Sequence, residues 1–509
     1  MKRNSLKIAS AALLLLVLFV FSSVLASCAE SGQADDTTAP QALTGEEVST
    51  APEETELTSK TLPAGLDYGG ETIVILSRNA DGVNDEFLSE EIVGDLIKDS
   101  VYARNKAVEK LLNIVVDARL TESNGAYLVT DEIVALQQSG DHIYDIISNS
   151  TYSTISKTST GVLRNLNDCE YLDLSAPYWS QGYSEATSLG TGQYLATGAI
   201  SLSMYRYMFV TFFNSNMFEE KNQASLYDVV NSGDWTLDYQ IGLLDIFYDD
   251  LNGNGQADEN DCFGFASNLV SYIDPYWSSC DLPILTKNQD NWFEISIDLD
   301  RVSNAIDKVI ELYYGHNSYI GPNEGSDPGF QARMTKIFSE SRAATCTMRL
   351  LTVETEDIKN MIDVYGIIPM PKLNAEQAEY HTFMHDQLSA VGIPCTVTED
   401  SRFQMIGGIL EAMAVESQKT LVPAYYEVAL KGRYLRSSQA VQMLDLIYDS
   451  VRIDGGVLYT SSLGNIHSTM RTIVAAKTNT TASSFKAAVK LADNNLKKLQ
   501  DSFRELQGG

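Results

Sequence analysis

The segment 250–261 has the residue types and spacing of a calcium-binding loop. Oxygen-bearing side chains stand at positions 1, 3, 5, 9 and 12 of these twelve residues, and glycine at position 6 permits a sharp turn. Calcium takes about six to eight oxygen ligands in flexible geometry, and this spacing wraps them around one centre. We therefore predict a structural Ca2+ ion; the alternative is an Asn/Gly/Asp turn without metal. The expected ligands are Asp250, Asn252, Asn254, Gln256, Asp258 and Asp261.

Two features distinguish this segment from the loop of a calcium sensor. Position 12 is Asp261, where glutamate is usual, and the shorter side chain reaches an ion less easily with both oxygens. Residues 237–249 read as a helix and 263–266 as a strand, so the loop is single and joins a helix to a strand. That arrangement suits a structural ion.

Aromatic and planar polar side chains in predicted loops have the chemistry to bind a carbohydrate. Sugars present apolar C–H faces that stack on aromatic rings, and their hydroxyl groups need hydrogen-bonding partners. For each ring, packing in the core is the competing interpretation. The polar candidates directly follow predicted strands, where open α/β sheets bind ligands. The candidates are Ser77, Arg78, Asn79, Trp179, Tyr205, Tyr272, Trp277 and Arg349.

Catalytic motifs are not found in the sequence. It has no G-x-S-x-G, no P-loop and no G-x-G-x-x-G, and His381 and His385 lack the glutamate of an H-E-x-x-H zinc site. A glycosidase-type carboxylate pair stays open as an alternative, because the 68 acidic residues single out no two. We therefore expect that the chain is not an enzyme.

The elements that position these residues begin with a strand–helix alternation. Short apolar runs at 72–76, 114–116 and 144–147 read as strands, and 94–112 and 130–138 read as helices between them. This order at this spacing predicts a parallel sheet that is covered on both faces.

The rest of the chain continues the α/β pattern and ends in helices. A long aromatic run at 205–214 and shorter runs at 344–348 and 365–369 predict further strands. The chain is mainly helical from Phe403, and the last helix carries apolar residues at alternating spacings of four and three. This spacing places the apolar residues along one side of the helix. Packing of that side on the rest of the chain explains the pattern better than a coiled-coil dimer does.

Charge and cysteine content bound the class of protein. The formal net charge is −32, and a field of that sign repels nucleic acid; solubility explains the acidity.

Besides Cys28 there are five cysteines without a C-x-x-C motif. Cys262 and Cys280 are the nearest pair, and we expect buried free thiols rather than a disulfide, which an extracellular location would permit.

The first residues resemble an export signal. Three cations precede an apolar run at 8–20, which is shorter than the ~20 residues of a membrane span. Leu25-Ala26-Ser27-Cys28 then resembles a bacterial lipobox, which implies cleavage after residue 27 and a lipid on Cys28. The alternatives are an ordinary cleaved signal peptide and a short membrane anchor. Residues 28–64 have few large apolar residues, so we expect a disordered tether.

Several segments resemble, in their order along the chain, the extracellular solute-binding proteins of ABC sugar importers (family 1). The first are Leu166-Asn167-Asp168, residues 172–179 and 198–203, and the sequence Phe212-Phe213-Asn214 that leads into a helix. Ser232-Gly233-Asp234-Trp235-Thr236-Leu237-Asp238, residues 365–372 and 422–426 complete the set. Their order is more specific than any single segment.

The resemblance implies a two-lobed, periplasmic-binding-protein-like (type II) α/β fold with a hinge between the lobes. The N-terminal lobe is expected to comprise 65–203 and 340–386, and the C-terminal lobe 204–339 and 387–509. The implied protein is a monomer, lipid-anchored on the extracytoplasmic face of the cell membrane, that delivers a carbohydrate to the membrane subunits of an ABC permease. The oligosaccharide is expected to be trapped by closure of the lobes. A glycan-active surface enzyme and a sensing or adhesion lipoprotein are the alternatives.

Overall fold

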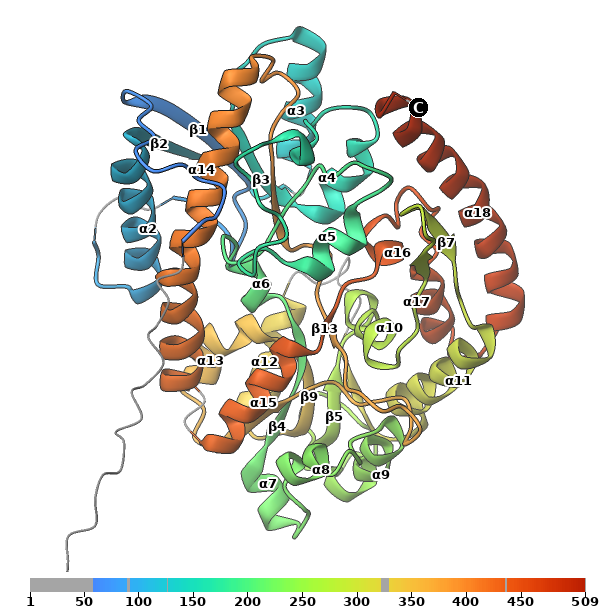
Figure 1. The fold of residues 1–509 in the computed structure, drawn as a ribbon. Coiled ribbons are helices and arrows are strands. Elements are labelled where there is room, and N and C mark those ends of the chain that lie inside the picture. Colours follow the sequence, from blue (N-terminus) through green and yellow to red (C-terminus); the bar gives the residue numbers. More distant parts are fainter. Residues whose placement is uncertain (1–57, 89–91, 126, 322–328, 435–436, 509) are drawn as a thin grey trace, which may run out of the picture. The chain divides into compact units, whose positions relative to one another are not determined.

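The computed structural model describes residues 58–508 apart from 89–91, 126, 322–328 and 435–436. Two sheets, each covered by helices, organise these residues (Figure 1). Within the described ranges, no helix is both long and apolar enough to span a membrane. We call the parts built around the two sheets the first and the second lobe.

The start of the chain, including the predicted signal peptide and Cys28, lies outside the described residues. Residues 58–64 are described and contact the body. Ser59 donates a hydrogen bond to Glu411 over 2.9 Å, and Thr61 donates to a backbone carbonyl 2.7 Å away. The prediction of a disordered tether is therefore wrong for these residues, because short polar side chains can find acceptors on the body.

The first lobe is built on a four-stranded sheet of order β12-β3-β1-β2. Strands β1 (Glu71–Ser77), β2 (Ile114–Leu120) and β3 (Ile146–Ser150) are parallel, as predicted. β12 (Ser389–Gly392) pairs antiparallel with β3 at the edge. Its helices are α2 (Leu96–Leu112), α3 (Leu128–Ser139), α4 (Thr151–Thr158), the short η1 (Leu166–Asp168), α5 (Gln181–Thr187) and α14 (Asp400–Lys419).

The side-chain alternation of β1 explains why helices cover both faces of this sheet. Successive strand residues point to opposite faces. Ile73 and Ile75 belong to the apolar cluster that contains Ile406 of α14, whereas Leu76 belongs to the cluster that contains Val129 of α3. A strand buried on both faces reads as a continuous apolar run, and this run marked β1 in the sequence.

Helix α2 shows local signals at both of its ends. Asp95 caps its first turn by accepting hydrogen bonds from the backbone amides of Ile97 and Lys98. Asn113 ends it in the left-handed conformation, with φ of 50°, which asparagine tolerates better than most residues. The chain therefore turns directly from α2 into β2.

The second lobe is built on a five-stranded sheet of order β10-β4-β9-β5-β8. β4 (Phe209–Asn214) is antiparallel to β10 (Tyr365–Ile368) and to β9 (Ala343–Arg349), whereas β5 (Phe263–Ser267) is parallel to β9 and to β8 (Tyr319–Ile320). The larger helices are α9 (Leu237–Phe247), α11 (Leu299–Ile310), α12 (Phe330–Ser339), α15 (Ser438–Asp449), α17 (Ser468–Ala475) and α18 (Thr481–Leu506).

Shorter elements complete the second lobe and the links between the lobes. The helices are α6 (Ser203–Arg206), α7 (Ser215–Glu220), α8 (Leu226–Asn231), α10 (Pro275–Ser279), α13 (Glu356–Lys359) and α16 (Gly455–Leu458). Helical turns of other types are η2 (Val270–Tyr272), η3 (Glu311–Gly315), η4 (Leu350–Glu354) and η5 (Pro423–Tyr434). The short strands are β6 (Leu285–Lys287), β7 (Phe293–Ile295), β11 (Thr382–Phe383) and β13 (Val451–Arg452).

The strand pairings correct the predicted division into lobes. We expected 340–386 in the first lobe, but β9 and β10 pair with β4 in the sheet of the second lobe. We expected 387–509 in the second lobe, but β12 pairs with β3 in the first. A buried strand has the same apolar pattern in either sheet, so the sequence did not reveal which sheet each strand joins. The predicted strand at 205–214 is also shorter, since α6 and Tyr207 precede β4.

A buried arginine connects the lobes beside the first crossing of the chain. Arg206 of α6 is 4% exposed and pairs with Asp85 of the first lobe over 2.8 Å and with Glu354 of the second over 2.9 Å. The hydroxyl of Tyr425 donates to the same Glu354 carboxylate over 2.8 Å, and the Tyr425 ring lies 5.4 Å from the guanidinium. We call these four residues the hinge network.

The terminal helix α18 contacts both lobes. It packs along α11 and α17 through buried residues such as Phe485 and Leu496, as the apolar seam predicted. At its end, the ring of Phe503 lies 5.6 Å from that of Tyr194, and Gln507 donates a hydrogen bond to the carbonyl of Leu189 over 2.8 Å. The last turn of α18 therefore docks on a loop of the first lobe, along one side of the molecule (Figure 1).

The cysteines of the described ranges are all free, as expected from the sequence. Cys280 and Cys346 are buried in the second lobe, and burial raises the pKa of the Cys280 thiol to about 12. Cys262 and Cys280 form no disulfide with each other.

Candidate ligand-binding site

Polar side chains gather where β1 and β3 end. Because the carboxyl ends of parallel strands meet at one edge of a sheet, Arg78 after β1 and Ser150 at the end of β3 lie close together. Both donate hydrogen bonds to the Gln387 side-chain oxygen, over 3.2 Å from Arg78 Nη1 and 2.9 Å from Ser150. The other terminal nitrogen of Arg78 donates to the Gln387 carbonyl. Gln387 lies on 381–388, the segment that crosses between the lobes.

The buried ring of Tyr207 brings one arginine from each lobe to this edge. Arg78 of the first lobe lies 6.0 Å from the centre of the ring, and Arg349, at the end of β9 in the second lobe, lies 5.0 Å from it. The Tyr207 hydroxyl donates to the carbonyl of Asp81 over 2.9 Å. Burial raises the pKa of Tyr207, and the two guanidinium groups oppose that shift. The ring therefore stays a neutral partner for both cations.

A neutral histidine lies beside the same ring. The edge of His385 meets Tyr207 at a centroid distance of 6.1 Å, and the Gln387 amide donates to His385 Nδ1 over 3.2 Å. Burial holds the pKa of His385 well below its usual value, and Arg349 and Arg78 are among the cations that reinforce the effect. The Asp386 carboxylate lies 3.7 Å from Nδ1.

Next to Arg349 the second lobe has an open cavity of about 300 Å³. The Tyr272 ring stands at its wall, edge-on to Phe209 at 5.3 Å and to Phe330 at 6.0 Å. The cavity thus combines an aromatic surface with planar donors and hydroxyl groups, which is the chemistry that sugar rings need. Its walls are formed by Tyr272, Gln331, Ala332, Thr335, Arg349, Leu351, Thr352, Thr355 and Asp357.

Two tyrosines of the first lobe lie close to the crossing segment. The rings of Tyr127 and Tyr152 are 6.2 Å apart, and the Tyr152 amide donates to the carbonyl of Asp386 over 2.9 Å. Burial, together with Tyr152, raises the pKa of Tyr127 to about 12, so its hydroxyl remains a donor at neutral pH. Tyr127 is 48% exposed and accessible to a ligand.

Five of the eight predicted ligand-binding residues lie at the ends of β1 and β9 or beside Arg349. Ser77 and Asn79 flank Arg78 in sequence. The buried Ser77 hydroxyl has no hydrogen-bond partner among the described residues, and the backbone amide of Asn79 donates to the Thr121 hydroxyl over 3.0 Å. Tyr272 and Arg349 line the cavity of the second lobe. Tyr207 and Gln387 were not predicted from the sequence. Tyr207 lies within the predicted strand 205–214, and Gln387 lies in a connecting segment without a recognisable motif. His385 was named only as a weak candidate zinc ligand.

The other three predicted residues are packed elsewhere. Trp179 is 2% exposed and donates through Nε1 to Glu411 over 3.1 Å. Tyr205 stacks on Tyr448, with the ring planes 1° apart. Trp277 donates to the carbonyl of His467 over 3.3 Å. All three side chains are packed in the core, which was the competing interpretation. The two tryptophans also line separate cavities.

We expect Trp179→Phe to destabilise the chain without weakening ligand binding. The substitution leaves a buried oxygen of Glu411 without its indole donor, and the loss of a hydrogen bond to a charged group costs about 1.5–3 kcal/mol. Urea unfolding of the variant measures this loss. Tyr171→Phe, at a half-buried neighbouring ring, is the control, and unchanged stability of Trp179→Phe would contradict the prediction.

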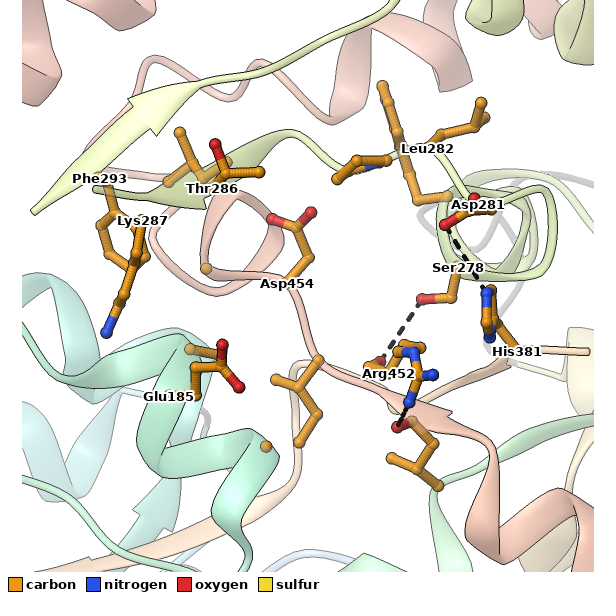
Figure 2. A pocket seen from close by; sticks show the side chains of 18 residues that line it. Glu185, Ser278, Asp281, Leu282, Thr286, Lys287, Phe293, His381, Arg452 and Asp454 are labelled. Atoms are coloured by element: carbon orange, nitrogen blue, oxygen red, sulfur yellow. Dashed lines mark hydrogen bonds and ion pairs between the residues drawn. The ribbon is translucent and has the colours of Figure 1, made fainter. Parts of the chain in front are cut away.

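A larger cavity, of about 570 Å³, lies between α5 of the first lobe and β6, β13 and α16 of the second (Figure 2). Two of its charged side chains, Lys287 and Asp454, form hydrogen bonds within the protein. Lys287 donates to the carbonyl and the hydroxyl of Ser188, each over 2.7 Å, and Asp454 accepts from the amide of Ile284 over 2.7 Å. Burial lowers the pKa of Lys287 to about 8 and raises that of Asp454 to about 6. The cavity is therefore a gap between the lobes that lies away from the ends of β1, β3 and β9.

The predicted calcium loop joins α9 to β5, which confirms its helix–loop–strand setting. Its carboxylates accept hydrogen bonds from the loop itself. Asp250 accepts from two glycine amides over 2.8 Å, and the buried Asp261 accepts from the amides of Leu251 and Asp258 over 3.1 and 3.0 Å. Hydrogen bonds, first of all from the Asn260 amide, lower the pKa of Asp258 to about 2.

The side chains of Asn252 and Asn254 both point their amide groups at Asp258, and that of Asn254 lies 2.7 Å from it. In the described part of the chain, no three His, Cys, Asp or Glu side chains lie close enough together to hold a metal ion. The oxygen-rich donor set fits Ca2+ by chemistry, since Asn and Asp oxygens are ligands that this ion prefers. Calcium binding stays a prediction.

Comparison with known proteins identifies the fold. No family model and no curated protein matches the sequence. A cyclic α-maltosyl-1,6-maltose binding protein from Arthrobacter globiformis has a TM-score of 0.56 at 11% identity, covering 84% of this chain and 100% of that one. The acarbose-binding GacH receptor of Streptomyces glaucescens has a TM-score of 0.53 at 12% identity, with coverages of 85% and 99%.

An ABC substrate-binding protein from Listeria monocytogenes, solved in complex with cycloalternan, has a TM-score of 0.52 at 12% identity and coverages of 84% and 99%. These similarities extend over nearly the whole of each solved structure. They confirm the predicted two-lobed α/β fold of the periplasmic-binding-protein type.

Proposed function

We propose that this chain is the substrate-binding protein of an ABC importer and captures a carbohydrate between its two lobes. The observation that carries the proposal is the meeting of Arg78 and Arg349, one from each lobe, at Tyr207 beside the cavity that Tyr272 lines. This site lies at the strand ends where α/β sheets bind ligands. Solved proteins of the same fold bind cycloalternan, acarbose and cyclic α-maltosyl-1,6-maltose, which supports a sugar as the ligand.

Lobe closure supplies the mechanism of capture. A ligand that contacts both lobes binds the closed state more tightly than the open one, and this difference in affinity shifts the population toward closure. The crossing segment 381–388 carries Gln387, which accepts hydrogen bonds from the end of the first sheet. Ligand contacts at Arg78 therefore act directly on the segment that must bend.

Thermal denaturation with a panel of oligosaccharides tests the proposal. Ligand at about 100 times its Kd stabilises the folded state by about 2.7 kcal/mol, which is a measurable rise in Tm. We expect at least one saccharide to raise the Tm and to lose this effect in Tyr272→Ala. A rise with peptides or nucleosides but with no saccharide would overturn the proposal.

A turnover measurement distinguishes a binding protein from a glycan-active enzyme. We expect each saccharide that raises the Tm to be recovered intact after prolonged incubation with the protein, as measured by chromatography. Release of shorter products would instead assign hydrolysis to the site.

Isothermal titration against the isolated permease subunits, with and without sugar, distinguishes a role in transport from one in sensing or adhesion.

We further propose that Cys28 carries the lipid that holds the protein on the extracytoplasmic face of the membrane. The lipobox-like sequence before it supports this proposal. Metabolic labelling with palmitate is expected to mark the native chain and not Cys28→Ser, which should be found in the medium. Labelling of the serine variant would contradict a lipid at this position.

Calcium is proposed to occupy the loop 250–261 and to stabilise the second lobe. We expect Ca2+ to raise the Tm of the native chain and not of Asp250→Asn, because the variant lacks a carboxylate at position 1 of the loop. Asp245→Asn, on the exposed face of α9, is the matched control. Equal shifts in the native chain and in Asp250→Asn would place the ion elsewhere.

A further inference from the structure

Three arginines of the described residues are at least nine-tenths buried, and they differ in how their charge is satisfied. Arg206 pairs with two carboxylates. Arg104 uses Nε and both terminal nitrogens on neutral acceptors, the closest being the carbonyl of Glu86 at 2.7 Å. Among the described residues, the Arg78 side chain donates hydrogen bonds only to Gln387, forms no ion pair, and leaves its Nε without a partner. Its hydrogen-bonding capacity is incompletely used.

A second cation without an ion pair stands on the same ring. Among the described residues, Arg349 has no carboxylate within ion-pair distance, and its hydrogen bond goes to the neutral side chain of Gln331 over 3.3 Å. The two guanidinium groups lie 6.0 and 5.0 Å from the centre of the Tyr207 ring, and the charge of Arg349 acts unfavourably on that of Arg78. This is unusual in a chain with 68 acidic and 36 basic residues, where carboxylate partners are abundant.

Among the described residues, Glu86 and Asp386 act electrostatically on Arg78, and Asp357 lines the cavity beside Arg349. Glu86 is buried and accepts from the Ser201 hydroxyl over 2.7 Å, and burial raises the pKa of its carboxyl group. Asp386 lies on the crossing segment, and Asp357 is an exposed residue of the cavity wall. Burial lowers the pKa of Arg78, and Arg349 adds to that effect. An anion in the cavity beside Arg349 would relieve this repulsion.

We propose that the ligand is an anionic saccharide whose acidic group pairs with Arg349, in the field of Arg78. This inference rests on the proposed function and specifies its substrate class. Arg349 lines the 300 Å³ cavity, and a planar guanidinium can bind a carboxylate through two parallel hydrogen bonds. Thr352 and Thr355, on the same wall, supply hydroxyl groups for the sugar ring. A uronic acid presents both chemistries in one residue.

Binding of a charged sugar and of its neutral ester tests the proposal. The probes are trigalacturonic acid and its methyl ester, which share one backbone and differ in charge, together with a glucuronic-acid-substituted xylo-oligosaccharide and glucose 6-phosphate. Isothermal titration at low salt measures each Kd. We expect an acidic probe to bind at least about tenfold more tightly than the neutral ester, with an affinity that falls as salt is added.

Arg349→Gln is expected to abolish the preference for the acidic probe, and Arg349→Lys to retain part of it, because lysine keeps the charge but not the planar fork. Arg342→Gln is the matched control. It removes one charge next to the start of the same strand, where Arg342 pairs with Glu340 over 2.7 Å at the surface. Circular dichroism confirms that each variant is folded before titration.

The outcomes separate the two proposals. Equal affinity for neutral and acidic saccharides, or an acidic preference that survives in Arg349→Gln, overturns the anionic ligand and leaves the sugar-binding function standing. Absence of binding by every saccharide, neutral and acidic, overturns both. Preference for glucose 6-phosphate over the uronic acids supports an anionic sugar and assigns the charge to a phosphate.

Discussion

Replacing Arg206 by methionine is expected to lower the free energy of unfolding by about 3–5 kcal/mol. The guanidinium is 4% exposed and holds Asp85 of one lobe and Glu354 of the other. Methionine fills much of the volume but leaves two partly buried carboxylates facing each other without a cation. Removing one partner of a buried pair costs more than the pair contributes, because the remaining charge is stranded away from water.

Urea unfolding, followed by circular dichroism, measures this effect. Arg119→Met is the matched control, since Arg119 pairs with Asp117 at the surface and such pairs contribute about 0–1 kcal/mol. Arg206→Lys should be intermediate, because a single ammonium group cannot replace the fork that reaches both carboxylates. A loss in Arg206→Met no larger than that in Arg119→Met would show that the hinge network contributes nothing to stability.

We expect the ligand-free protein to lose stability as the pH falls below about 6.5, through two buried histidines. Burial holds the pKa of His385 and that of His467 well below the usual value in the folded chain. Arg349, Arg471 and Arg78 lower the pKa of His385 further, and Arg471 lowers that of His467. The unfolded chain therefore binds protons that the folded chain does not.

The stabilising contribution of each histidine is complete above the unfolded pKa and is lost as the pH falls below it. The free energy of unfolding should fall by about 1.4 kcal/mol per pH unit for each histidine below that value. Urea unfolding at several pH values between 5 and 8 measures the slope. The free energy of unfolding of His385→Gln and of His467→Gln should each change less with pH than that of the native chain. That of His316→Gln, at the surface of the second lobe, should change as much as in the native chain. Parallel curves for all four proteins would contradict the prediction.

Local patterns in the sequence predicted individual elements well. The apolar run that became β1 and the apolar seam of α18 each depend on neighbours a few residues away. The lobe to which β9 or β12 belongs depends instead on pairing with strands more than a hundred residues distant. Such pairing leaves no local trace in the sequence, so the predicted lobe boundaries were wrong at these strands.

The candidate site was predictable to the extent that topology fixed it. Ser77, Arg78 and Arg349 were selected because they follow strands, and strand ends meet in this class of fold. Trp179 and Trp277 were selected for their residue type, and residue type alone does not separate a ring that stacks on sugar from one that donates to Glu411 or to a backbone carbonyl. Tyr207 was missed because it stands where the sequence suggested a continuous strand.

The docking of α18 on the first lobe has a kinetic consequence for a ligand held between the lobes. Opening that separates α18 from the loop near Leu189 must break the Gln507 hydrogen bond and the contact of Phe503 with Tyr194. These contacts lie on a terminal helix and not in the ligand-binding cavity. The residence time of the bound ligand would then depend on residues that the ligand never touches, and two chains with identical cavities could release the same sugar at different rates.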